Sequence, residues 1–172
     1  MKTHTLIAIS LALCLSACDK AADRVPSLAR TPTPVDDPDA PPAPGVHAIP
    51  PWAAGLMGKS FANTYPGKPG TCIGNTDSIT ARTKAGTEIV GWAWDTAAAV
   101  VVPQIVLVDA TGTMIGAGET GLPRDDVTKA MPQVTSKTPG WSAFTPKETG
   151  EIKAYGLLND GKGTCVLGGI KL

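Results

Sequence analysis

EIVGWAWDTA, residues 88–97, is the clearest β-strand signal in this chain. It combines β-branched residues with two tryptophans, and both kinds of side chain are enriched in strands. Side chains two positions apart in a strand point to the same side of the sheet, so Trp92 and Trp94 are expected to stand next to each other. The chain has only 4 tryptophans, so this pair matters for any small core that it builds.

The two faces of this predicted strand differ in bulk. Val90, Trp92 and Trp94 lie on one face, whereas the other face carries the small residues Gly91 and Ala93. We expect the tryptophan face to be buried, with Trp92 in the core. Trp94 is closer to the end of the strand, where an indole is either buried or half-exposed and able to stack on a sugar ring.

Further short β-rich runs follow the same pattern, and turn sequences rich in Gly, Asn, Asp and Pro separate them, such as NDGKG at 159–163. One helix is expected over 125–131, between two prolines. The pattern predicts an all-β domain, an antiparallel β-sandwich of the jelly-roll or immunoglobulin-like kind. Its remaining strands are expected at about 73–81, 103–109, 113–119, 141–146, 151–158 and 164–171.

The amino terminus has the features of an export signal. A basic start precedes an apolar run over 5–17 that is too short to span a bilayer comfortably. The run ends in LSAC at 15–18, which resembles the lipobox of bacterial lipoproteins. The resemblance implies that 1–17 is a lipoprotein signal peptide, that Cys18 is lipidated, and that the protein is held on a membrane and faces the periplasm. An ordinary secretory signal is the alternative.

Two segments separate the predicted signal from the strands. Residues 18–51 are rich in proline and poor in aromatics, so they predict a lipid anchor followed by a disordered tether. Residues 52–70 carry large apolar side chains at roughly helical spacing, interrupted by glycines. They predict either an arm that packs on the domain or a segment that binds a partner. The β-domain itself is expected over 71–172.

Cysteine usage predicts one disulfide. With Cys14 removed with the signal and Cys18 lipidated, Cys72 and Cys165 remain. An even pair in an oxidising compartment predicts a bond between them, which ties the first strand of the domain to the last. Two free thiols are the alternative.

The histidines exclude several kinds of active site from the domain. His4 and His47 both precede it, so neither a histidine-based catalytic triad nor histidine-ligated zinc is expected there. No phosphate-binding loop or dinucleotide fingerprint occurs. The 15 basic and 15 acidic residues balance, so no basic stripe predicts nucleic-acid binding. We therefore expect no enzyme activity, no cofactor and no metal; a glycosidase with paired carboxylates is the alternative.

A set of short motifs, in this order, resembles a β-rich bacterial module: CIGNTDSIT (72–80), VGWAWD (90–95), IVLVDATGTMIGAGETGLPRDDV (105–127), GWSAF (140–144) and KAYGLLNDGKGTCVL (153–167). Such modules are mainly extracytoplasmic parts of polytopic membrane proteins, including ones that resemble glycosyltransferases. The module's Arg-Pro-Asp-Val is replaced here by RDDV. The resemblance covers about 72–167 and implies a surface-polysaccharide context, but it carries over no catalytic residue.

Candidate ligand-binding residues lie on this predicted domain: Trp94, Asp95, Arg124, Asp125 and Trp141. The tryptophans offer stacking surfaces for sugars, and Asp95 follows one of them directly. Arg124 and Asp125 precede and begin the predicted helix, where they either orient a polar ligand or pair with each other. We therefore expect a non-catalytic lipoprotein that binds an envelope glycan or an envelope-assembly partner. An inhibitor or immunity lipoprotein directed against a hydrolase is the alternative.

Overall fold

The computed structural model describes residues 48–172 of the chain. The predicted signal peptide, the predicted lipidation site Cys18 and residues 18–47 of the predicted tether lie outside the described residues. No helix found within 48–172 is long and apolar enough to cross a membrane.

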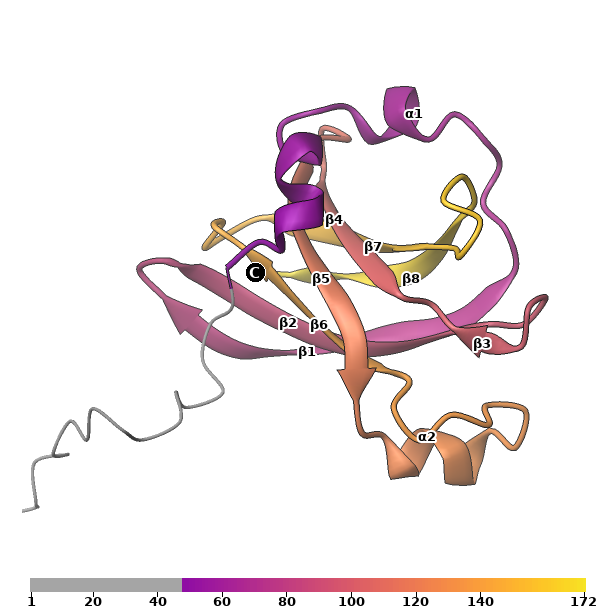
Figure 1. The fold of residues 1–172 in the computed structure, drawn as a ribbon. Helices are drawn as coiled ribbons and strands as arrows, with labels where there is room; N and C mark the ends of the chain where they lie inside the picture. Colours follow the sequence, from indigo (N-terminus) through magenta and orange to yellow (C-terminus); the bar gives the residue numbers. More distant parts are fainter. Residues whose placement is uncertain (1–47) are drawn as a thin grey trace, which may run out of the picture. The chain divides into compact units, whose positions relative to one another are not determined.

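The described part begins with two short helices and continues as a β-domain (Figure 1). Each strand expected from the sequence is present, a short strand β3 adds to them, and the helix expected at 125–131 is α2. The elements are η1, a 3₁₀-helix (Pro51–Leu56), α1 (Phe61–Thr64), β1 (Cys72–Thr83), β2 (Gly86–Asp95), β3 (Val100–Val101), β4 (Gln104–Asp109), β5 (Met114–Leu122), α2 (Asp125–Ala130), β6 (Gly140–Thr145), β7 (Glu151–Leu157) and β8 (Thr164–Lys171).

All the strands belong to one 8-stranded sheet. Their order is β1-β2-β6-β5-β4-β7-β8, with β3 paired to the end of β2, and the pairings are antiparallel. The sheet curls until β8 lies beside β1, where the Thr76 hydroxyl donates a hydrogen bond to the Leu167 carbonyl (3.0 Å). The prediction of an antiparallel all-β domain is confirmed, in the form of one sheet that closes almost completely on itself.

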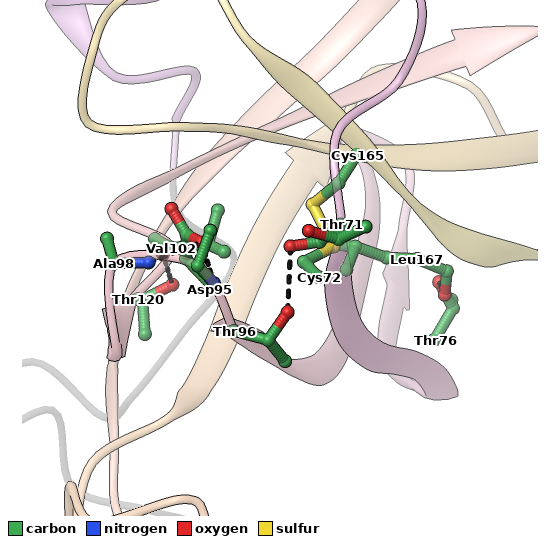
Figure 2. Close-up of a disulfide and its surroundings, with 11 residues drawn as sticks. Thr71, Cys72, Thr76, Asp95, Thr96, Ala98, Val102, Thr120, Cys165 and Leu167 are labelled. Carbon is green, nitrogen blue, oxygen red and sulfur yellow. Dashed lines mark hydrogen bonds between the residues drawn. A yellow bond between two sulfur atoms is a disulfide. The ribbon is translucent and has the colours of Figure 1, made fainter.

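The predicted disulfide between Cys72 and Cys165 is confirmed and closes the seam between β1 and β8 (Figure 2). The two Cα atoms are 5.9 Å apart, and the residues are separated by 93 positions in the sequence. Just before β1, the Gly70 N–H donates to the Thr164 carbonyl (2.6 Å). The bond therefore fastens the first strand to the last at the place where the ladder of backbone hydrogen bonds around the sheet is interrupted.

The largest side chain in the interior of the curled sheet is that of Trp141 on β6, which is 0% exposed. Trp141 lies opposite Gly91 on β2, and a Cβ atom at residue 91 would come within 2.4 Å of its ring. Ile89, Gly91 and Ala93 therefore form the inward face of β2. The expectation that the tryptophan face of β2 builds the central core was wrong, because the small residues of β2 make room for the indole of β6.

Two apolar patches on the outside of the sheet are covered by other parts of the chain. Trp94 packs with Val127 of α2 and with Val134 in the loop after it. The segment 52–70 packs on the outer side of β4, β5 and β7 and is hydrogen-bonded to β5 through Gly58 N–H and the Met114 carbonyl (2.9 Å). We call this segment the arm; its packing side chains are Trp52, Leu56, Met57, Phe61 and Tyr65.

Candidate functional site

Most of the residues predicted to bind ligand are buried. Trp94 is 3% exposed and Trp141 is 0% exposed. A buried indole has no free face on which a sugar ring can stack. The interpretation of these two tryptophans as half-exposed platforms is therefore corrected: α2 and the following loop cover Trp94, and the closed sheet surrounds Trp141. Trp92, which was assigned to the core, is the more exposed of the pair on β2.

Asp95 shapes the turn between β2 and β3. The residue is 4% exposed, and its Oδ1 accepts hydrogen bonds from the backbone N–H groups of Ala97 (2.9 Å) and Ala98 (3.1 Å) (Figure 2). Aspartate commonly fixes turns in this way. Its carboxylate is thus oriented by its own backbone and not toward a ligand.

Arg124 pairs with carboxylates other than Asp125. Its Nε and Nη2 donate to the two oxygens of Asp126 at 2.8 and 2.7 Å, and its Nη1 donates to Asp77 on β1. The hydrogen bond from Arg124 lowers the pKa of Asp126 to about 2. A pair between Arg124 and Asp125 was one of the two predictions for these residues, and the partner was wrong. Arg124 instead pairs with Asp126 and with Asp77, and the second ion pair ties the start of α2 to β1. Asp125 is exposed.

A cavity of about 420 Å³ lies over β4, β7 and β8, away from all of these predicted residues. Its size falls within the range of roughly 300–1,000 Å³ that small-ligand sites usually have. We call it the lysine cavity. Its lining residues are Val108, Asp109, Ala110, Gly112, Glu151, Ile152, Lys153, Tyr155, Gly169, Ile170 and Lys171.

The alternation of β7 places the polar side chains of this cavity. Ile152 and Ala154 point into the buried core, so Glu151, Lys153 and Tyr155 share the outward face. In the ladders on either side, Lys153 lies opposite Val108 of β4 and opposite Gly169 of β8. Gly169 lets the two strands approach closely, because a Cβ atom at residue 169 would lie 2.8 Å from the Ile152 carbonyl oxygen and 3.6 Å from Cγ of Lys153.

The charged groups of the lysine cavity are not neutralised by one another. Glu151 lies opposite Lys171 in the β7–β8 ladder, yet the ion pairs found within residues 48–172 all belong to Arg124. Glu151, Lys153 and Lys171 therefore stand at the cavity without an ion-pair partner among the described residues. Burying such groups without partners is costly, so they stay in contact with solvent or a ligand.

Asp109 has a different role at the rim. Its Oδ1 accepts hydrogen bonds from the Thr111 N–H (2.9 Å), the Thr111 hydroxyl (2.6 Å) and the Thr113 N–H (3.1 Å). The hydrogen bond from the Thr111 side chain is the main reason why the pKa of Asp109 is lowered. Asp109 thus holds the turn after β4 and is ionised at neutral pH.

A smaller hollow of about 200 Å³ lies beside the lysine cavity. The two share Asp109, Ala110, Glu151 and Ile152, and the smaller one extends to Lys147 and Thr149 in the loop before β7. The charge of Lys147 also contributes to the lowered pKa of Asp109. We call the two hollows together the groove; Lys153 and Lys171 line its larger part and Lys147 lines its smaller part.

Tyr155 connects the lysine cavity to the arm. Its ring packs against Phe61 with 4.1 Å between the ring centroids, and Phe61 also packs against Tyr65 at 5.4 Å. Tyr155 is partly buried and lines the cavity. The arm thus supports one wall of the site without lining it.

The residues of this cavity were not predicted from the sequence to bind a ligand. The run EIKAY at 151–155 has the alternation of an ordinary half-exposed strand. Only the register of β7 with β4 and β8 brings its outward side chains beside Gly169 and Lys171. The pair Gly168-Gly169 inside a predicted strand was the one available signal, because glycine within a strand often marks a bulge or a close approach.

Within residues 48–172, no group of three or more His, Cys, Asp or Glu side chains is placed to hold a metal ion. Comparison of the chain with protein-family models, curated proteins and solved structures finds no match.

Proposed function

We propose that the β-domain is a non-catalytic binding module of a lipid-anchored protein that faces the periplasm, and that the lysine cavity binds an envelope glycan. The observation that carries this proposal is a cavity of about 420 Å³ whose Glu151, Lys153 and Lys171 have no ion-pair partner among the described residues. Sites for small ligands usually combine an apolar lining with a few such polar groups.

The mixture of groups at the cavity suits a saccharide. Each sugar hydroxyl both donates and accepts hydrogen bonds, and the cavity offers lysine donors, a carboxylate acceptor and the Tyr155 hydroxyl, which does both. Ile170, which is only partly buried, adds apolar surface for the C–H face of a sugar ring. This chemistry takes the place of the tryptophan platform that the sequence offered as one alternative.

Catalysis is not part of the proposal. Hydrolysis of a glycoside by paired carboxylates needs one carboxyl group to act as an acid and a second to act as a base or nucleophile. Of the two carboxylates at the cavity, Asp109 is held by hydrogen bonds of its own turn. Glu151 alone remains for a ligand, and it serves as an acceptor.

Titration of the full-length protein in detergent micelles with a panel of envelope glycan fragments tests the proposal. We expect backbone amide shifts in NMR spectra at residues 151–155 and 169–171. Glu151→Ala is expected to weaken binding. Glu148→Ala is the matched control, because Glu148 is exposed in the same loop region but does not line the cavity. Shifts elsewhere on the domain, or none with any glycan, would contradict the proposal.

A further inference from the structure

We infer that the glycan bound in the lysine cavity is an acidic saccharide, whose carboxylate or phosphate groups contact Lys153 and Lys171, with Lys147 at the far end of the groove. This inference rests on the proposed function and names the ligand class of the same site.

Lysines from separate parts of the chain converge on this groove. Lys153 comes from the middle of β7, Lys171 ends β8, and Lys147 precedes β7. They outnumber the carboxylates of the groove, which are Asp109 and Glu151. The groove therefore has an excess of positive charge, although the chain as a whole has equal numbers of basic and acidic residues.

The arrangement of Lys153 and Lys171 leaves a place for an anion. Lys153 is opposite Gly169, and Lys171 is two residues further along β8, so the two lysines are diagonal neighbours. Diagonal neighbours on one face of a sheet are roughly 7–8 Å apart at their Cα atoms. The like charges of two lysines on neighbouring strands repel each other, and an anionic group placed between the two ammonium groups attracts both.

The carboxylates at the groove do not already fill this role. Glu151 faces Lys171 across the ladder but makes no ion pair within the described chain. Asp109 directs Oδ1 to Thr111 and Thr113. The lysines are thus left for an external anion, whereas the cation of Arg124 elsewhere on the domain is already paired with Asp77 and Asp126.

The shape and lining favour a saccharide over an acidic peptide. The lysine cavity and the smaller hollow are neighbours that share lining residues, and two adjoining hollows suit a short extended chain. The groove also carries the acceptor Glu151, which repels the closely spaced carboxylates of an acidic peptide. Sugar hydroxyls, in contrast, donate to this acceptor while the anionic groups of the same chain reach the lysines.

A matched set of ligands tests the inference: trigalacturonic acid, its fully methyl-esterified form, a phosphorylated trisaccharide and tri-glutamate. The ester keeps the sugar rings and removes the charge. For the full-length protein in micelles at low salt, we expect an acidic saccharide to bind roughly three- to tenfold more tightly than the ester. We expect added salt to reduce this preference, because exposed charges are screened.

Variants separate the contributions. Lys153→Gln and Lys171→Gln are expected to abolish the preference for the acid and to leave binding of the ester unchanged. Lys129→Gln is the control, because Lys129 is exposed on α2 and does not line the groove. A preference for the uronate or for the phosphorylated sugar identifies which anionic group the lysines select.

The results of these titrations distinguish failure of this inference from failure of the proposed function. Equal binding of acid and ester would overturn it while the proposed function stands. Binding of no saccharide at all would overturn the proposed function as well. Equally tight binding of tri-glutamate would show that charge alone is recognised and would overturn the assignment to a saccharide.

Discussion

Two regions on the outside of the same sheet use polar and aromatic side chains in opposite ways. At the tryptophan patch, formed by Trp92, Trp94 and the covering α2, the aromatic rings are packed and Arg124 is fully paired. At the lysine cavity, the charged side chains of Glu151, Lys153 and Lys171 have no ion-pair partner among the described residues. The tryptophans and the arginine, which stand out in the sequence, thus stabilise the fold. The lysines and the glutamate of the cavity, which look like ordinary strand residues, are exposed and can contact a ligand. Substitutions at the two regions are therefore expected to separate stability from binding.

The largest effect on stability is expected at the disulfide between β1 and β8. β1 carries Asp77, which pairs with Arg124 beside the tryptophan patch, and β8 lines the lysine cavity. Replacing both Cys72 and Cys165 by alanine removes a cross-link between residues that are 93 positions apart. The chain-entropy model gives about 4–5 kcal/mol for a loop of this length. Urea unfolding of the variant and the parent measures the difference. Since β8 also forms a wall of the lysine cavity, binding is expected to weaken too; an unchanged midpoint would contradict a role for the seam.

The next effect distinguishes the tryptophans of β2. Trp94 is 3% exposed, so Trp94→Ala is expected to cost about 3–5 kcal/mol, as for other large buried aromatic residues. Trp92 is only partly buried, and Trp92→Ala is expected to cost clearly less. Denaturant unfolding of the two variants tests this order. If Trp92→Ala were the more damaging, the assignment of Trp94 as the better-packed ring would be wrong.

The sequence predicted the elements of this fold well, because turn residues and alternating strands are local signals. The pairing of Cys72 with Cys165 was also accessible from cysteine counting. Which face of β2 points inward could not be predicted from the sequence. Both faces of β2 are largely apolar, and the interior face is selected by the indole of Trp141, which is far from Gly91 in the sequence and lies opposite it on the neighbouring strand β6. The two-residue alternation of side chains along a strand shows which residues share a face. It does not show which of the two faces the rest of the chain will cover.

The same limit applies to the candidate site. Arg124 and Asp125 looked like a polar pair, but the fold brings Asp77 from β1 to Arg124. Lys153 and Lys171 lie far apart in sequence and meet only through the β7–β8 register, which shifts between Lys153 and Tyr155. Bulges of this kind are set by tertiary context. Local pattern therefore predicts where a strand runs, whereas a site made from several strands depends on their register.

A smaller effect is expected at the ion pairs of Arg124. Arg124→Gln removes the partner of Asp77 and Asp126, and we expect a decrease of only a few degrees in melting temperature because the network is partly exposed. The pKa of Asp126 is about 2 in the folded protein and about 4 when unfolded. Its contribution to stability is thus present above about pH 4 and lost as the pH falls toward 2.

Melting curves between pH 6 and pH 2 give the comparison for this network. The parent is expected to lose more stability than Arg124→Gln between about pH 4 and pH 2, since the variant has no ion pair left to lose. Parallel pH profiles for the two proteins would show that the network contributes nothing to stability in solution.

The smallest effect on stability is expected at the lysine cavity itself. Lys153 faces outward and has no ion-pair partner among the described residues, so Lys153→Ala is expected to change the free energy of unfolding by less than about 0.5 kcal/mol. A bound ligand raises the stability of the parent, because it binds only the folded state. An acidic saccharide is therefore expected to raise the melting temperature of the parent more than that of Lys153→Ala, and Lys129→Ala is expected to behave like the parent. Strong destabilisation by Lys153→Ala without ligand would show that its stem, packed beside Gly169, serves the fold, and the contrast between the two regions would then disappear.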